Sequence, residues 1–260
     1  MKNKDKVDIS FVMACKGSRR YEDFGTNFVS SIYELAKGSG YTFEIIISHP
    51  NKIDDDRVIW LEEKENLGPS VAFNNCAKIS KGSYLALCID DHVATGDIFG
   101  AIDFLKSDLF KDRKYKITTL SGGLLDILTF VEERPTHPHL LDSENVFNMP
   151  RFHVMPFPII ERETYENLLG GYILHPKTWG MGDWYLGAFL FHNEEPGIQY
   201  NAAKYQFLPN DPRTPEPQKQ SFPHVYNSIY KLIKNYKKGM DYVYDAGIEA
   251  YNPKDDIPEA

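Results

Sequence analysis

The chain has 260 residues and a mass of 29.9 kDa, a size that fits one large domain or two small ones. Hydrophobic residues make up 42% and charged residues 25%, so we exclude a wholly disordered chain, a collagen-like chain and a small disulfide scaffold. The 37 acidic and 29 basic residues give a net charge of −8, which disfavours nucleic-acid binding because that function needs clustered cations.

The cysteines and the apolar runs indicate a cellular location. Cys15, Cys76 and Cys88 lie among apolar residues without metal-ligand spacing, so we expect buried thiols in a reducing compartment. No segment approaches the ~18 consecutive apolar residues of a membrane span, and the apolar run at 11–15 is too short for a signal-peptide core. We therefore predict a cytoplasmic protein.

The first part of the chain alternates strand and helix patterns. Nearly unbroken apolar runs predict four buried strands, at residues 9–15, 43–48, 57–61 and 84–89. Two helices are expected between them, one from the spacing of Phe24, Phe28, Ile32 and Leu35, and one at 69–80 that begins near Pro69. This order predicts an α/β sheet, mostly parallel, with ligands at the carboxyl ends of its strands.

The rest of the chain is less regular. Apolar spacing at Ile98, Ile102 and Leu105 predicts a helix, and strands are expected at 116–120 and 124–131. Order is expected to return over 165–191 after a long loop or lid at 132–158, and prolines at 209–223 predict an extended arm. A last helix carries Lys231, Lys234, Lys237 and Lys238 on one face, which is either solvated or permits peripheral membrane association.

Two adjacent carboxylates, Asp90 and Asp91, follow the strand at 84–89. At the end of a buried strand they repel each other and lose hydration. A divalent cation relieves both costs, and hard oxygen ligands suit a Mg²⁺ or Mn²⁺ ion that also binds substrate phosphates. The alternative is an acidic turn exposed to water.

The residues around this pair follow a known pattern. The stretch from Asn66 to Asp91, NLGPSVAFNNCAKISKGSYLALCIDD, resembles a hallmark of family-2 glycosyltransferases with a GT-A fold. In that hallmark, N-x-G-x-x-x-A-x-N-x-G-x-x-x-A-x-G-x-Y-L precedes an apolar strand and a D-x-D or DD motif. Cys76 and Ser80 replace a glycine and an alanine of the pattern, and His92 stands where many members carry another aspartate.

Further segments extend the resemblance, which spans about residues 7–192. The opening ISFVMACKGSRR is similar to the family's first strand and nucleotide loop, and FEIIIS is similar to its second strand. After that strand the family usually places an acidic residue that meets the base, and this chain has Ser48 and His49. The segments GGY at 170–172 and WGMGDWYLG at 179–187 resemble the family's G-G-[FY] and G-x-E-D-x-x-L block.

The resemblance implies a role for the second block in acceptor binding and catalysis. Asp183 would be the catalytic base that takes the acceptor proton, or alternatively a helix cap. Trp179 and Trp184 flank it and would stack on the acceptor sugar, unless they belong to the core.

The same resemblance implies a donor site and a metal site. Asp90 would contact the ribose of the nucleotide, and Asp91 would bind Mn²⁺ or Mg²⁺ with His192 or His224 completing the shell. We expect the side chain of His92 to point away from Asp91, because successive residues at a strand end face opposite ways. The expected donor contacts are Ala14, Lys16, Arg19, Asn66, Gly68, Asn74, Asp90 and Gly171.

The prediction is therefore a GT-A-type α/β fold with a Rossmann-like, mostly parallel central sheet. The transferase domain would span 1–208, with a nucleotide-binding half at 1–95 and an acceptor half at 96–208. Residues 209–260 would form a Pro-rich arm and a C-terminal helix packed on that domain.

The resemblance implies a metal-dependent inverting glycosyltransferase that moves a sugar from a nucleotide-diphosphate donor, expected to be UDP-linked, to a glycan or other hydroxyl acceptor. Polysaccharide biosynthesis is the expected setting. Two alternatives stay open: a non-catalytic nucleotide- or sugar-binding module of the same fold, and a metal-dependent nucleotidyltransferase. A Rossmann dehydrogenase is disfavoured because no G-x-G-x-x-G follows the first strand.

Overall fold

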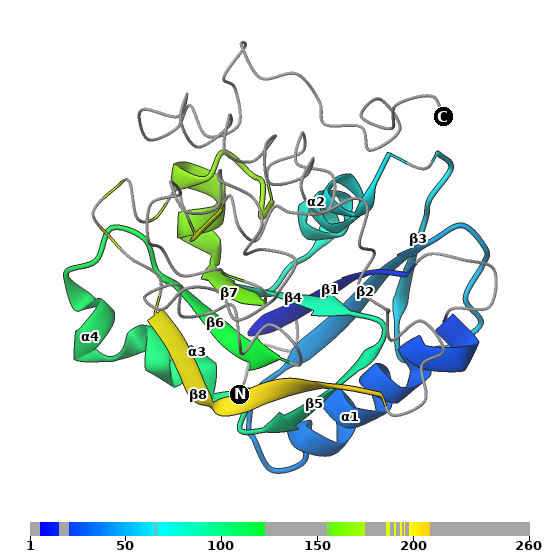
Figure 1. Ribbon diagram of the computed structural model, residues 1–260, viewed down its shortest axis with the longest axis horizontal. Coiled ribbons are helices and arrows are strands. Elements are labelled where there is room, and N and C mark those ends of the chain that lie inside the picture. The colour runs from blue at the N-terminus through cyan, green and yellow to red at the C-terminus, as the bar shows by residue number, and fades with distance from the viewer. Residues whose placement is uncertain are drawn as a thin grey trace, which may run out of the picture.

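One mixed sheet organises the structure. The computed structural model describes residues 6–15, 21–65, 67–122, 157–174 and 198–208, together with residues 155, 186, 187, 190, 193 and 195. Eight strands follow the order β3-β2-β1-β4-β7-β6-β8-β5, and helices cover both faces (Figure 1). The β4–β7, β7–β6 and β8–β5 pairs are antiparallel and the other four pairs are parallel, which confirms a mostly parallel α/β sheet.

The first four strands form the parallel half of the sheet. β1 (Ile9–Ala14) lies between β2 (Phe43–His49) and β4 (Tyr84–Ile89), and β3 (Ile59–Glu62) forms the edge beside β2. The residues of β1 up to Met13 are all buried, because a strand in the middle of this sheet is covered on both faces. The structure thus confirms all four strands expected in this part of the chain.

The other half contains strands that the sequence did not suggest. β6 (Ile117–Gly122) confirms the strand expected at 116–120. β5 (His92–Gly96), β7 (Pro158–Glu161) and β8 (Ile198–Phe207) were not predicted. β8 runs between β6 and β5, so a segment far along the chain closes the sheet beside the strand that follows Asp91.

Helices enclose a separate core on each face of the sheet. α1 (Thr26–Ala36) and α3 (Gly100–Lys106) lie on one face, and α2 (Pro69–Ile79) lies on the other (Figure 1). Phe28 and Ile102 belong to the first core. The smaller elements are the π-helical turns η1 (Tyr21–Gly25) and η3 (Thr164–Leu168) and the short helix α4 (Asp108–Lys111).

All three predicted helices in this region are confirmed, within a few residues of their expected ends. The strand expected at 124–131, the arm at 209–223 and the last helix lie outside the described residues, as does most of the loop expected at 132–158. The segment 165–191 is described only in part.

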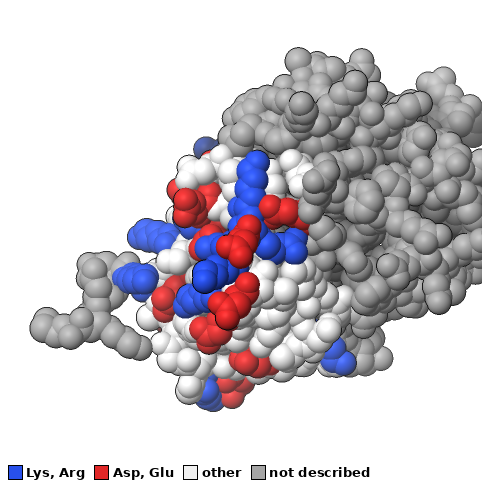
Figure 2. Space-filling view, turned by 90° about the vertical axis from the view of Figure 1, so that its left-hand side faces the viewer, with Lys and Arg blue, Asp and Glu red and all other residues white. Residues whose placement is uncertain are grey.

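Charges of both signs are interspersed on the face shown in Figure 2, where neither forms a broad patch among the described residues. Ion pairs such as Lys116–Glu161 (3.5 Å) and Arg162–Glu166 (3.7 Å) join opposite charges within the described chain. None of the helices in the described ranges has the length and apolar character needed to cross a bilayer.

Candidate functional site

The predicted site residues gather where the parallel strands end. Ala14 is in register with Ser48 of β2 and with Ile89 of β4, and Ser48 is in register with Leu61 of β3. Asp90 follows Ile89 directly, so the acidic pair begins at the carboxyl edge of the central strands. That edge is where open α/β sheets bind ligands.

The acidic pair is not a simple exposed turn. Asp90 is buried, with 4% of its surface exposed, and the side chain of Asp91 is 21% exposed. The backbone of Asp91 is anchored because its carbonyl oxygen accepts a hydrogen bond from the Leu208 amide at 2.9 Å, at the end of β8. Two consecutive acidic residues thus lie at this strand end, one of them with little water around it.

The expectation for His92 was wrong. Its Nδ1 lies 2.6 Å from Oδ1 of Asp91, so the imidazole meets the carboxylate instead of pointing away from it. The strand rule fails here because Asp91 belongs to the turn between β4 and β5, whereas His92 is the first residue of β5. The His92 ring is buried and packs edge-on against Phe157, with ring centroids 5.3 Å apart.

The donor set fits a hard divalent cation that a substrate helps to hold. Asp90 and Asp91 carry carboxylate oxygens on consecutive residues, and this is the ligand type that Mg²⁺ and Mn²⁺ prefer when phosphates supply further oxygens. In the described part of the chain no group of three or more His, Cys, Asp or Glu side chains is placed to hold an ion alone. His192 and His224, the expected additional ligands, lie outside the described residues.

The start of α2 brings a backbone turn to the same edge. Gly68 precedes Pro69 at the first helical position and has a φ of 91°, a conformation that favours glycine. The glycine of the N-x-G motif is thus needed for the chain to enter the helix. Asn66, the other motif residue, lies outside the described residues.

Asn74, a predicted donor contact, makes hydrogen bonds within the protein through its side-chain amide. Its Oδ1 accepts hydrogen bonds from the amides of Ile173 (2.9 Å) and Leu174 (3.2 Å), and its Nδ2 donates to the Leu174 carbonyl (2.7 Å). The side chain is buried and its amide is used within the protein. Asn74 therefore ties α2 to the segment after the Gly170-Gly171 turn.

The turn at Gly170 and Gly171 begins the second sequence block and lies within the described residues. Gly170 and Gly171 have φ angles of 66° and 78°, and the Gly171 amide donates to the Tyr165 carbonyl at 2.9 Å. A Cβ at Gly171 would meet nothing within 4 Å, so its glycine is required by backbone conformation and not by crowding. The remaining predicted contacts, Lys16, Arg19, Trp179, Asp183 and Trp184, lie outside the described residues.

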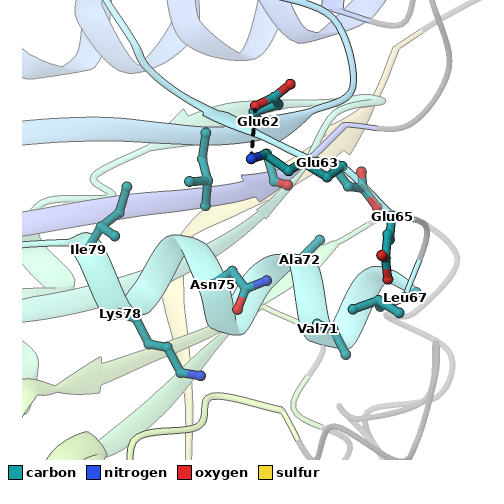
Figure 3. Close-up of a pocket in the computed structure, with 13 residues that line it drawn as sticks. Glu62, Glu63, Glu65, Leu67, Val71, Ala72, Asn75, Lys78 and Ile79 are labelled. Atoms are coloured by element: carbon teal, nitrogen blue, oxygen red, sulfur yellow. Dashed lines mark ion pairs between the residues drawn. The ribbon is translucent and has the colours of Figure 1, made fainter.

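A pocket of about 510 Å³ opens between α2 and the end of β3 (Figure 3). Glu62, Glu63 and Glu65 lie along one side of it, and Val71 and Asn75 of α2 lie along the other. Ser48 and Gly68 also line it, so it reaches the carboxyl edge of the sheet. Lys64 lies 3.9 Å from Glu62 in a long surface ion pair, and Lys78 of α2 also lines the pocket, so three glutamates are set against two lysines.

This pocket was not predicted from the sequence. The acidic run EEKE at 62–65 could have indicated the pocket, because it directly follows the third strand in a fold whose ligands bind at strand ends. The three carboxylates disfavour a diphosphate beside them, but they can accept hydrogen bonds from neutral N–H or O–H groups.

Comparison with known proteins places the fold. No family model matches the chain, and no curated protein matches it. Among solved structures, the mannosyltransferase PcManGT from Pyrobaculum calidifontis, in complex with GDP-Man and Mn²⁺, aligns with a TM-score of 0.55 and 13% identity over 90% of this chain and 66% of its own.

Two more structures agree. Glucosyl-3-phosphoglycerate synthase from Mycobacterium tuberculosis, in complex with Mn²⁺, UDP and glucosyl-3-phosphoglycerate, aligns with a TM-score of 0.53 and 12% identity over 87% of this chain and 80% of its own. TarS 1–349 from S. aureus gives a TM-score of 0.51 and 11% identity, over 87% and 64% respectively. This chain thus spans slightly less than two thirds of the TarS fragment and of PcManGT. The likeness confirms the predicted GT-A-type fold.

Proposed function

We propose that this chain is a metal-dependent glycosyltransferase that moves a sugar from a nucleoside-diphosphate donor to a hydroxyl acceptor. One observation carries the proposal: Asp90 and Asp91 stand at the carboxyl end of β4, at the ligand-binding edge of a GT-A-type sheet. Solved structures with this fold hold UDP or GDP-Man, in two of them together with Mn²⁺.

The charges at the site suggest where each part of the donor lies. Glu62, Glu63 and Glu65 would repel a diphosphate placed beside them, so we assign the pocket end near Ser48, Glu63 and Gly68 to the base or ribose. The diphosphate would lie toward Asp91, where a cation offsets the charge of both the carboxylate and the phosphates. Asp90 would contact the ribose.

Asp91 would hold the cation, with a histidine such as His192 or His224 completing its shell. A Mn²⁺ or Mg²⁺ ion held there would stabilise the negative charge that develops on the departing diphosphate. The residues of the chain must then align the acceptor oxygen with the sugar carbon and remove its proton.

We assign proton removal to Asp183 and acceptor stacking to Trp179 and Trp184. In an inverting displacement, the acceptor oxygen forms a bond to the anomeric carbon as the bond to the diphosphate oxygen breaks. The acceptor proton passes to the Asp183 carboxylate, and the nucleoside diphosphate leaves with the bonding electrons. A UDP-linked sugar is the expected donor.

Thermal unfolding with nucleotides tests the proposal. A ligand at about 100 times its Kd stabilises the native state by about 2.7 kcal/mol, which is about 5–10 °C for a chain of this size. We expect UDP or GDP to raise the midpoint of the wild-type protein, and Mn²⁺ to enlarge the shift. Asp91→Asn should lose the Mn²⁺-dependent part, while the exposed Asp54→Asn should keep it.

The possible outcomes separate the alternatives. No shift with any nucleotide would reduce the likeness to fold alone, and an unchanged Mn²⁺ effect in Asp91→Asn would overturn the metal assignment. Product analysis decides the rest, because a glycosyltransferase releases a nucleoside diphosphate from a nucleotide sugar, whereas a nucleotidyltransferase releases pyrophosphate from a nucleoside triphosphate. Binding without either product would indicate a non-catalytic module.

A further inference from the structure

The contact between His92 and Asp91 is more than a chance surface pair. The Nδ1–Oδ1 distance is 2.6 Å, and the imidazole is 3% exposed against 21% for the carboxylate. With the carboxylate ionised, Nδ1 carries the proton and donates it, because a carboxylate can only accept. The buried partner is therefore the donor, and the more exposed partner is the acceptor.

The imidazole itself is held firmly. His92 is paired with Phe207 in the β5–β8 ladder, and its ring contacts Phe157 with an interplanar angle of 62°. Phe157 packs in turn against Tyr205, with ring centroids 4.7 Å apart. The backbone of Asp91 is fixed by the Leu208 amide. Strand pairing, aromatic packing and one backbone hydrogen bond thus place both the donor and the base of the carboxylate side chain.

We propose that His92 is a positioning residue that orients the Asp91 carboxylate for cation binding. This inference rests on the proposed function, because it assumes that Asp91 is a metal ligand. A carboxylate on a turn otherwise samples several rotamers, and a cation must select one of them. A hydrogen bond that fixes this orientation beforehand lowers the entropic cost of binding, as outer-shell partners of metal ligands do.

Substitutions of different shape can separate hydrogen bonding from packing. His92→Asn retains an N–H donor close to the position of Nδ1. His92→Gln carries its donor farther out, near the position of Nε2, and His92→Phe keeps a ring but has no donor. A role in packing alone would favour the Phe variant, whereas a positioning role requires the Asn variant to be the best of the three.

The measurement is the affinity for Mn²⁺, obtained from the electron paramagnetic resonance signal of the free ion in the presence of saturating UDP, and separately of GDP. We expect His92→Phe and His92→Gln to weaken Mn²⁺ affinity by about 10–100-fold, and His92→Asn to stay within about threefold of wild type. The apparent KM for Mn²⁺ should rise by the same factor, with kcat at saturating Mn²⁺ changing much less. Circular dichroism establishes that each variant is folded.

Each result bears on a different claim. If Asp91→Asn binds Mn²⁺ as wild type does, or if wild type binds none with either nucleotide, the metal part of the proposed function fails and this inference fails with it. If Asp91→Asn loses binding while His92→Phe and His92→Gln keep wild-type affinity, only the role of His92 is wrong. Should His92→Phe fail to fold, the Asn and Gln variants decide alone, and equal affinities in those two would overturn the proposal.

Discussion

Three aspartates carry the proposed reaction, and each uses a different property of a carboxylate. Under the proposed function, Asp91 would supply oxygen ligands, Asp90 would accept hydrogen bonds from hydroxyls, and Asp183 would take a proton. Asp183→Asn keeps the size of the side chain but removes its basicity. We therefore expect this variant to bind the donor and Mn²⁺ normally and to transfer sugar about 10²–10⁴-fold more slowly. Calorimetry measures donor binding, and release of the nucleoside diphosphate in the presence of acceptor measures turnover. Wild-type turnover would remove Asp183 from the mechanism.

A fourth aspartate, Asp55, is structural. Arg57 reaches its two oxygens through Nε (2.9 Å to Oδ1) and Nη2 (2.7 Å to Oδ2), and Tyr21 donates its hydroxyl proton to Oδ2. The guanidinium of Arg57 holds the pKa of Asp55 well below its usual range, against the opposing effect of burial. This cluster connects the entry to α1 with the segment before β3. Arg57 therefore serves the fold.

The depressed pKa of Asp55 predicts a pH-dependent stability. A carboxyl whose pKa is lower in the folded state stabilises the protein fully above its unfolded pKa, near 4, and progressively less below it. Asp55→Asn should lower the free energy of unfolding by about 1–2 kcal/mol at neutral pH, a value discounted for the partial exposure of Arg57. The difference from wild type should shrink between about pH 4 and pH 3. Urea unfolding at each pH measures it, and Asp54→Asn, an exposed neighbour, is the matched control.

At the scale of elements, α2 carries a buried tie. Asn74 joins the helix to residues 173–174 through three hydrogen bonds, whereas its neighbour Asn75 is exposed. Asn74→Ala leaves two buried amides and one carbonyl without this partner, so we expect a loss of about 2–4 kcal/mol in the free energy of unfolding. Asn75→Ala should change it by less than about 0.5 kcal/mol. Chemical denaturation measures the free energy of unfolding of both variants. Equal losses in the two would show that the hydrogen bonds of Asn74 contribute little to stability.

Local pattern was sufficient for elements whose burial is continuous. The central strands are apolar on both faces, and α1 repeats its buried residues at Phe28, Val29 and Ile32, so each could be predicted from its own residues. β8 could not, because Ala202, Lys204 and Gln206 on its exposed side are poor strand formers. Its partners β5 and β6 lie far away in the sequence, and only that long-range pairing specifies the strand.

The candidate site likewise has features that could be predicted from the sequence and features that could not. The position of Asp90 and Asp91 followed from the strand before them and from the rule that ligands bind at strand ends. The hydrogen bond from His92 could not be foreseen, since it depends on a turn that ends β4 and on the pairing of β5 with β8. Asn74 matched a motif, yet the partner that occupies its amide comes from about a hundred residues later.

At the scale of the whole molecule, one sheet separates two cores, and each core contains at least one cysteine. Cys15 and Cys88 belong to the core under α1, and Cys76 belongs to the core under α2. All three are buried, as predicted from their apolar neighbours. Burial raises the pKa of Cys76 to about 12, and burial also raises the pKa of Cys88 well above its usual range. The thiolate is the reactive form of cysteine, so Cys76 and Cys88 must be both exposed and ionised before they react. Both changes depend on unfolding.

This arrangement predicts how the native protein responds to a thiol reagent. At about pH 8, where an exposed thiol is substantially ionised, we expect Cys76 and Cys88 in native protein to react with Ellman's reagent orders of magnitude more slowly than in concentrated guanidinium, and Cys15 to be protected by its burial. If the two cores open together, all three thiols should react at one rate, which a ligand specific to the native state slows equally. Labelling followed by mass spectrometry assigns the rate at each site, with and without UDP and Mn²⁺. Rapid labelling of Cys76 alone would instead show that the core under α2 opens by itself, and a ligand effect confined to Cys76 would place nucleotide binding beside that helix.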